Sequence, residues 1–130
     1  MKPMLAVNIA TDAVRFPVYA SAKLDGVRGV VIGGRLFSRN LKPIPNAHVA
    51  KLFGRAELNG LDGEIIVGAP TDKNAFRNTS GAVRRADGQP EANFYVFDNF
   101  LAPGGFAQRL ASVAKWGTWG VHSIVVLEQR

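Results

Sequence analysis

The chain has no cysteine and only two histidines, His48 and His122, among its 130 residues. The lack of thiols excludes disulfide frameworks, thiolate zinc sites and cysteine nucleophiles. Two histidines that lie far apart in the sequence do not indicate a histidine-rich metal centre. Any chemistry that the protein performs must therefore use other groups.

Long apolar segments are also missing. No apolar run approaches the roughly 18 residues that span a bilayer, and residues 1–10 lack the charged start and long apolar stretch of a secretory signal. Internal repeats, low-complexity tracts and long linkers are absent. With 47% hydrophobic and 20% charged residues, the composition is that of a soluble core. We expect one intracellular domain, or a piece of one, without a membrane partner.

Positive charge is concentrated in one segment. The chain has 16 Lys and Arg against 10 Asp and Glu, a net charge of +6. Residues 23–55 carry seven basic residues and one acidic residue, Asp25, so seven minus one accounts for the whole excess. Such a segment attracts the phosphates of a nucleotide or a nucleic acid, but it is equally typical of a solvated face. Charge alone does not decide between the two.

The residue pattern predicts an α+β domain, built on antiparallel sheet with short flanking helices. The dipeptide Gly33-Gly34 suits the tight turn of a hairpin, and Asn46 suits a helix N-cap. Apolar residues recur at helical spacing in the last predicted helix. We expect strands over 18–22, 29–32, 35–38, 63–67, 94–97 and 121–127, and helices over 47–54, from 79–80 into 82–83, and over 106–116.

A candidate nucleophile lies in residues 22–29, AKLDGVRG. Lys23 leaves a strand-like run and meets an Asp-Gly turn, and Arg28 follows five residues later. A lysine amine becomes nucleophilic when partial burial or nearby cations, here Arg28 and Arg39, depress its pKa. The same octapeptide is also typical of a plain hairpin with a surface lysine.

Three further segments carry groups suited to a nucleotide or a nucleic acid. Ser38, Arg39 and Lys42 offer a hydroxyl, a guanidinium and an ammonium to phosphate oxygens. Glu64 alternates with apolar residues in a predicted strand, where its carboxylate can face a cleft and accept ribose hydroxyls. Phe97 precedes Asp98 at a strand end, so its ring can stack on a base while the acid approaches a metal or a cation. Taken singly, these residues are also typical of turns or of a core.

In their order along the first hundred residues, these segments resemble the covalent nucleotidyltransferases, in particular the small ATP-dependent DNA ligases of viruses and phages. The resemblance implies a partial, ATP-grasp-like nucleotidyltransferase domain. The shared segments are Lys2-Pro3-Met4-Leu5-Ala6, Lys23-Leu24-Asp25-Gly26-Val27-Arg28, Ser38-Arg39 with Lys42-Pro43-Ile44, Asp62-Gly63-Glu64-Ile65, Thr79-Ser80 and Tyr95-Val96-Phe97-Asp98.

The resemblance also implies an activity, the sealing of 5′-phosphate/3′-hydroxyl nicks in duplex DNA during repair or replication, with ATP and Mg²⁺ as cofactors. Lys23 would carry AMP as a lysyl-AMP intermediate. The implied ATP-binding residues are Ser21 at the base, Lys23, Arg28 and Glu64 at the ribose, and Phe97 stacked on adenine. The implied DNA-binding residues are Arg39 at the nick 5′-phosphate, Ser38, Lys42, Thr79 and Ser80, and the implied metal ligands are Asp25 and Asp98.

The chain departs from this pattern after its first hundred residues. A further glutamate motif, a Lys-x-Lys pair and an oligonucleotide-binding barrel, all expected of such a ligase, do not appear. We therefore expect residues 1–130 to be the N-terminal portion of an adenylation domain with little or no nick-sealing activity alone. The expected partners are nicked duplex DNA and a second chain, or another copy, that completes the domain. The expected location is the cytoplasm, or the host cytoplasm or nucleoid for a phage protein.

Other functions remain open at this point. An RNA ligase or an mRNA-capping guanylyltransferase fragment shares the lysine chemistry, although the SRNLKPI segment at 38–44 and the motif order favour DNA. A non-catalytic DNA-binding module would keep the basic segment without the reaction. A structural β-rich domain would make the motifs coincidental.

Overall fold

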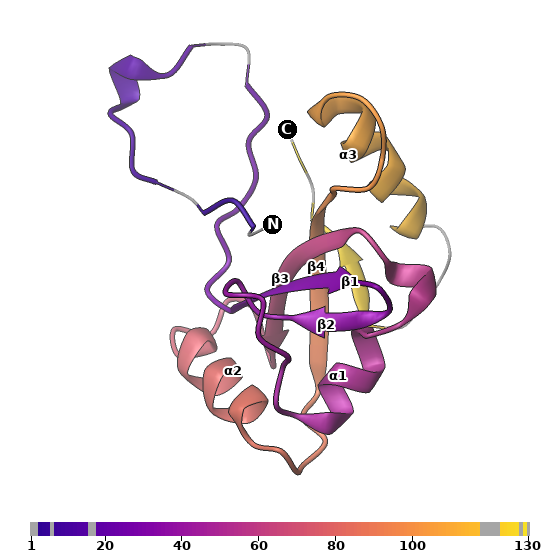
Figure 1. Ribbon diagram of the computed structural model, residues 1–130. Helices are drawn as coiled ribbons and strands as arrows, with labels where there is room; N and C mark the ends of the chain where they lie inside the picture. Colours follow the sequence, from indigo (N-terminus) through magenta and orange to yellow (C-terminus); the bar gives the residue numbers. More distant parts are fainter. Residues whose placement is uncertain (1–2, 6, 16–17, 118–122, 128, 130) are drawn as a thin grey trace.

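The computed structural model describes residues 3–5, 7–15, 18–117, 123–127 and 129. Within this part of the chain, five strands form one sheet in the order β2-β1-β3-β4-β5, flanked by three α-helices (Figure 1). The α+β fold class is therefore confirmed. The elements are β1 (Val27–Ile32), β2 (Arg35–Phe37), α1 (Ala47–Phe53), β3 (Leu61–Val67), α2 (Ala75–Arg84), β4 (Ala92–Asn99), α3 (Phe106–Ala114) and β5 (Ile124–Val126), with 3₁₀ turns at Thr11–Ala13, Ala56–Leu58 and Lys115–Gly117.

The strand pairing is antiparallel except at one edge. β1 and β2 form the predicted hairpin, in which Gly33 and Gly34 have φ angles of 58° and 75°, values that favour glycine in such a turn. β1 pairs with β3, and β3 with β4, in antiparallel fashion. β5 runs parallel to β4, because α3 lies in the connection between them and carries the chain back across the sheet.

Two secondary-structure predictions are wrong. The strand expected over 18–22 is absent: this stretch has no regular structure. The helix expected from 79–80 is longer and begins at Ala75, with Asn74 at its N-cap. Part of the last predicted strand, residues 121–122, lies outside the described residues, and β5 covers 124–126.

One face of the sheet builds the core. Alternation along β3 directs Leu61 and Ile65 toward the helices, and β4 adds Phe94 and Val96 in the same way. Val49 and Phe53 of α1, Val83 of α2 and Val113 of α3 complete this cluster. Because successive side chains of a strand point to opposite faces, the polar residues Asp62 and Glu64 of β3 lie on the other face of the sheet.

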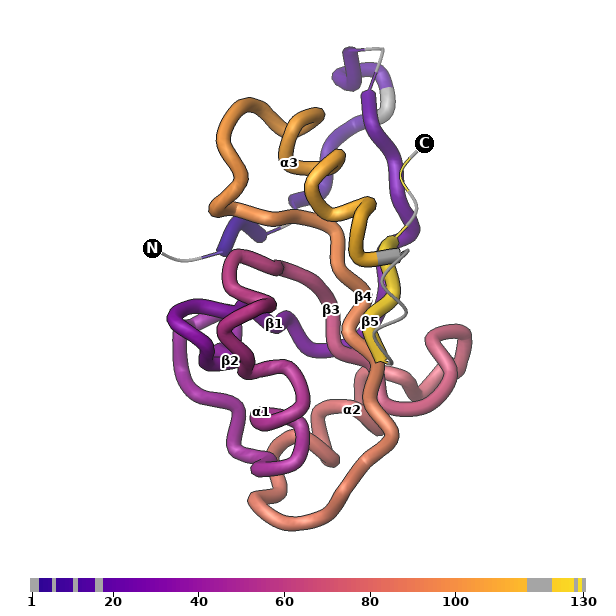
Figure 2. The backbone as a smooth tube through the Cα atoms, turned by 90° about the vertical axis from the view of Figure 1, so that its right-hand side faces the viewer, coloured from indigo at the N-terminus to yellow at the C-terminus, as the bar shows by residue number. Residues whose placement is uncertain are grey.

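The segment before β1 stands apart from this core. The described residues between 3 and 26 contain a single 3₁₀ turn, and they lie outside the sheet, beside α3 (Figures 1 and 2). Its apolar side chains are largely exposed: Met4 by 83%, Val7 by 85% and Ile9 by 63%. Tyr19 contacts Phe106 of α3 edge to face, with ring centroids 5.5 Å apart. Among the described residues, no helix is long and apolar enough to cross a membrane.

Asn46 fastens α1 to the loop after α2. Its fully buried side chain accepts a hydrogen bond from the Val49 N–H at 2.9 Å, which is the predicted N-cap. Its amide nitrogen donates to the carbonyls of Arg85 and Asp87, each at 2.9 Å, and to that of Gly88 at 3.3 Å. One side chain thus provides hydrogen-bond partners for a backbone N–H in the first turn of α1 and for three loop carbonyls.

We expect Asn46→Ala to lower the free energy of unfolding by about 2 to 3 kcal/mol, because the cap is lost and the loop carbonyls lose a buried donor. Chemical denaturation followed by circular dichroism measures this. Asn74→Ala is the matched control, since the Asn74 side chain makes no capping hydrogen bond. Equal losses in the two variants would contradict this role for Asn46.

Candidate functional site

The sheet face opposite the core carries a row of charged side chains on three neighbouring strands. The β1–β3 register places Arg28 opposite Glu64, and the β3–β4 register places Asp62 opposite Asp98. The β3–β4 pairing shifts at Asp62/Gly63, which re-aims the side chains at the end of β4. Residues from three predicted motifs therefore lie together on one surface.

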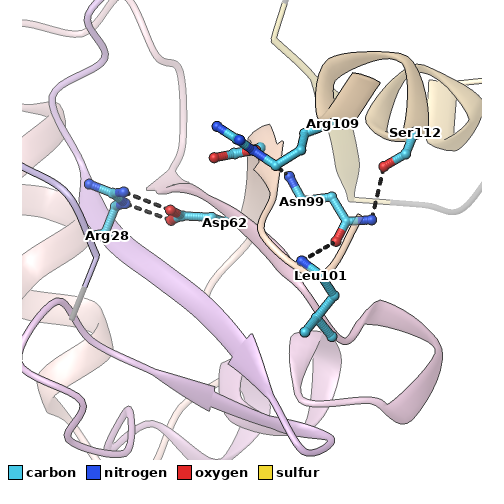
Figure 3. A network of polar contacts seen from close by, with 7 residues as sticks. Arg28, Asp62, Asn99, Leu101, Arg109 and Ser112 are labelled. Atoms are coloured by element: carbon cyan, nitrogen blue, oxygen red, sulfur yellow. Dashed lines mark hydrogen bonds and ion pairs between the residues drawn. The ribbon is translucent and has the colours of Figure 1, made fainter. Parts of the chain in front are cut away.

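Arg28 is the centre of this surface. Its Nε donates to Asp62 Oδ1 at 2.6 Å and its Nη2 to Asp62 Oδ2 at 2.7 Å, a two-point ion pair between β1 and β3 (Figure 3). Its Nη1 donates to the Met4 carbonyl at 2.7 Å, which attaches the N-terminal segment. The guanidinium also lies over the Phe97 ring, 4.9 Å from its centroid, within cation–π range.

Burial sets the protonation behaviour of this pair. Burial lowers the pKa of Arg28, but the hydrogen bond to Asp62 and the charges of Asp62, Glu64 and Asp98 together outweigh it, so the net shift is upward. The pKa of Asp62 is raised because burial outweighs the opposing hydrogen bond and charge of Arg28.

The pairing of Arg28 with Asp62 was not predicted from the sequence. Alternation could have indicated it, because Asp62 lies two residues before Glu64 and shares its face.

Glu64 is held close to the lysine motif. Its Oε2 accepts a hydrogen bond from the Gly26 N–H at 3.1 Å. A side chain at position 26 would collide with the Ile65 carbonyl and side chain of Ile66, so glycine permits this approach. Burial raises the pKa of Glu64, while the Gly26 hydrogen bond and the charges of Arg28 and Lys23 oppose the rise.

Lys23 precedes β1 on an exposed stretch of chain. Its side chain is 81% exposed, and Nζ lies 3.8 Å from Oδ1 of Asp25, which is 74% exposed. The expected partial burial of this amine is therefore wrong, because the side chain lies in solvent and forms its ion pair with a carboxylate. Ser21 is exposed in the same stretch without regular structure.

Asp98 and Asn99 join the end of β4 to α3. Asp98 Oδ1 accepts from Arg109 Nε at 2.9 Å and from the Asn99 N–H at 2.8 Å. Asn99 Nδ2 donates to the hydroxyl of Ser112 at 2.9 Å (Figure 3). Arg109 is a second residue near the site that the sequence analysis missed, since the helical pattern of α3 showed only its apolar positions.

The described residues do not fit a resident Mg²⁺ site. They contain no group of three or more His, Asp or Glu side chains that could hold a metal ion. Of the two predicted ligands, Asp25 is exposed and paired with Lys23, while Asp98 already accepts from a guanidinium and a backbone N–H. We therefore assign no chemical step to a protein-bound metal.

The predicted phosphate contacts at 38–42 lie on a tight turn after β2. The Ser38 N–H donates to the Lys42 carbonyl at 2.8 Å, and Ser38 Oγ accepts from the Lys42 N–H at 3.4 Å. Leu41 has a φ of 59°, the left-handed conformation that closes such a turn. Arg39 and Lys42 are exposed on it. The antiparallel hairpin places this turn near the beginning of β1.

The predicted contact of Thr79 with DNA is wrong. Thr79 lies in the middle of α2 with 0% exposure, and its Oγ1 accepts a hydrogen bond from the Val67 N–H at 2.9 Å. The hydroxyl therefore fastens α2 to the end of β3 and has no surface to offer to DNA. Its neighbour Ser80 is partly exposed.

This fold, with its five-stranded sheet and flanking helices, is that of the nucleotidyltransferase domain of DNA ligases. One structure of the Chlorella virus DNA ligase-adenylate aligns with a TM-score of 0.80 and 30% identity over 99% of this chain and 49% of that chain. Another aligns with a TM-score of 0.78 and 26% identity over 96% and 48%. The predicted resemblance to viral ATP-dependent DNA ligases is therefore confirmed.

A Lig E DNA ligase, solved in work on DNA binding with a minimal scaffold, aligns with a TM-score of 0.67 and 24% identity over 86% of this chain and 44% of that chain. At that identity the likeness supports the fold alone. No family model and no curated protein matches the chain. The chain spans about half the length of the ligases that it matches.

Glu64 should give stability a characteristic pH dependence. Because its pKa in the folded protein is raised above the ordinary 4.5, the folded state holds the proton more tightly than the unfolded state, and stability falls as the pH rises through the raised pKa. Glu64→Gln removes this pH-dependent loss of stability, and its amide oxygen can still accept a hydrogen bond from the Gly26 N–H. The unfolding free energy of the variant minus that of the wild type should therefore grow from pH 4.5 to neutrality.

Urea denaturation at a series of pH values measures this difference. Glu57→Gln, at an exposed glutamate of the 3₁₀ turn Ala56–Leu58, controls for the loss of one negative charge. A Glu64→Gln difference that stays constant, or that shrinks as the pH rises, would contradict the burial assigned to Glu64.

Proposed function

We propose that this chain is the N-terminal part of the adenylation domain of an ATP-dependent DNA ligase, with Lys23 as the nucleophile. One observation carries the proposal. Arg28, Glu64 and Phe97 come from three separate sequence motifs and lie together on the sheet: Arg28 faces Glu64 across the strands, and its guanidinium lies over the Phe97 ring; Lys23 precedes the same strand as Arg28 by four residues. The similarity to a ligase-adenylate supports the same conclusion.

The proposed reaction begins at Lys23. Its Nζ loses a proton and attacks the α-phosphorus of ATP, so that an N–P bond forms and the P–O bond to pyrophosphate breaks. The AMP then passes to the 5′-phosphate of a nick, which frees the lysine. The 3′-hydroxyl attacks the activated phosphate, the strand is sealed and AMP leaves.

Three side chains would orient the nucleotide. Arg28 and Glu64 suit the ribose, because the register of β1 and β3 sets a donor opposite an acceptor on one face of the sheet. Phe97 suits the adenine, because its partly exposed aromatic ring lies beside Arg28 near the end of β4. Ser21, in the chain leading to Lys23, is the proposed contact to the edge of the base, and Arg39 the proposed contact to the 5′-phosphate.

The net charge around the proposed site indicates that further cationic groups are needed to bind a triphosphate. The proposed site residues and their ion partners hold four cations, Lys23, Arg28, Arg39 and Arg109, against four carboxylates, Asp25, Asp62, Glu64 and Asp98. Four minus four leaves no net positive charge, which does not neutralise a triphosphate. We therefore propose that this chain alone seals few or no nicks, and that more of the adenylation domain, from a second chain or a longer one, supplies the missing cations. The exposed apolar residues of the N-terminal segment would suit such a partner.

Incubation with α-labelled ATP and Mg²⁺ tests the proposal on the protein itself. We expect label on far less than one in ten chains, because phosphate neutralisation is incomplete. The label should be acid-labile, as a phosphoramidate is, and should map to Lys23 by mass spectrometry. Lys23→Arg should abolish it, because the guanidinium is not nucleophilic, and labelled GTP should give none.

Lys73→Arg is the matched control, since Lys73 is an exposed lysine on the turn before α2; it should label as the wild type does. Label that persists in Lys23→Arg would refute the assignment of the nucleophile. Efficient labelling by GTP would favour a capping guanylyltransferase. Stoichiometric labelling by ATP would show that the charge on the face is already sufficient.

A further inference from the structure

Two aspartates face each other across neighbouring strands of the proposed site. The register of β3 and β4 places Asp62 directly opposite Asp98, and like charges in this position repel each other. Each carboxylate has an arginine partner from another element. Arg28 of β1 binds Asp62, and Arg109 of α3 binds Asp98 at 2.9 Å. The site therefore contains two ion pairs side by side.

Arg28 is within the influence of both carboxylates. Burial and the contact between Arg28 and Asp62 come first among the causes that set the pKa values of this pair, but the charge of Asp98 also raises both values. Of the five N–H donors of a guanidinium, Arg28 uses two on Asp62 and one on the Met4 carbonyl. Five minus three leaves two N–H groups without an acceptor in the described part of the chain. An Asp98 without its own arginine would therefore compete with Asp62 for Arg28.

Arg109 is held where it prevents this competition. Its side chain extends from α3 toward the end of β4 (Figure 3), and its guanidinium lies over the Phe106 ring, 5.4 Å from the centroid. The same ring contacts Tyr19 in the segment before β1. A hydrogen bond between Asn99 and Ser112 also attaches α3 to the end of β4. These contacts fix the distance between Arg109 and the strand that carries its carboxylate.

The position of Phe97 depends on the same arrangement. The pairing of β3 with β4 skips Phe97, because its neighbours Val96 and Asp98 pair with successive residues of β3. An unpaired residue in such a bulge is re-aimed relative to the regular strand. The Phe97 ring is covered by the Arg28 guanidinium, 4.9 Å from its centroid. A displacement of Arg28 would therefore also release the ring that is proposed to stack on adenine.

We propose that Arg109 is a positioning residue of the nucleotide site, which holds Arg28 in place by neutralising Asp98. Arg28 then stays on Asp62 and over the Phe97 ring, and Arg109 itself does not touch the nucleotide. The competing explanation is a purely structural role, in which Arg109 only fastens α3 to β4. The inference rests on the proposed function, because it concerns the same site, but the position of Arg28 can be measured without a nucleotide.

The Nε–Hε signal of Arg28 in ¹H–¹⁵N spectra tests the inference, because it reports the hydrogen bond to Asp62. Arg109→Gln removes the charge that neutralises Asp98, so we expect this signal to shift. The double variant Arg109→Gln/Asp98→Asn should restore the wild-type position, because the surplus carboxylate is gone and the new amide oxygen still accepts from the Asn99 N–H. Arg109→Lys keeps the positive charge and should also leave the signal near its wild-type position.

An ATP titration of the same variants measures the consequence for the site. The apparent affinity, followed by the amide signals of Glu64 and Phe97, should fall about tenfold in Arg109→Gln, the effect of one misaligned charge-assisted hydrogen bond. It should recover in the double variant. Arg77→Gln, at an exposed arginine of α2, controls for the loss of one positive charge and should change neither readout.

An Arg28 signal that does not move in Arg109→Gln, or a double variant that resembles the single one, would overturn the inference and leave the purely structural role. If Arg109→Gln does not fold, folding of the double variant would itself show the rescue, and failure of both to fold would overturn the inference. The expected Arg28 signals in a protein that binds no ATP would uphold the action of Arg109 on Arg28 and refute the proposed nucleotide site, so the two failures are distinguishable.

Discussion

The ion pair between Arg28 and Asp62 joins the strands on which the proposed site is built. Two hydrogen bonds of 2.6 and 2.7 Å connect β1 to β3. The same guanidinium covers Phe97 of β4 and binds the Met4 carbonyl. With side-chain exposures of 16% and 9%, the pair is largely shielded from water, and removing one partner would cost about 3 to 5 kcal/mol. This ion pair therefore stabilises the fold, and it also fixes the relative positions of the strands that carry the proposed site.

Two glycines make the arrangement possible at the level of the backbone. A side chain at Gly26 would collide with the Ile65 carbonyl, and one at Gly63 with the Tyr95 carbonyl. Each glycine follows an aspartate, in Asp25-Gly26 and Asp62-Gly63, next to a residue with a proposed role. Each motif therefore places a charged side chain beside a glycine, and the missing side chain of that glycine lets a neighbouring backbone approach closely. That combination explains how Glu64 and Arg28 share one face of the sheet, with Gly26 of the lysine motif held against Glu64.

Local patterns predicted much of the fold, and contacts between distant residues account for most of what they missed. The Gly33-Gly34 hairpin, the Asn46 cap and the central strands follow from residue chemistry and alternation. The strand expected at 18–22 fails because its apolar residues find no neighbouring strand among the described residues. Thr79 was misassigned because its burial depends on packing of α2 against β3, which a single segment does not encode. The exposure of Lys23 was likewise not readable from its neighbours in sequence.

The central claim is that residues from three motifs form one nucleotide site on the polar face of the sheet. An NMR titration of the ¹⁵N-labelled protein with ATP tests it most directly. We expect the amide signals of Gly26, Glu64 and Phe97 to shift together, with a common apparent affinity, while that of Gly81 on α2 stays unchanged. Shifts confined to residues away from the polar face, or no shifts at the three residues, would contradict the account.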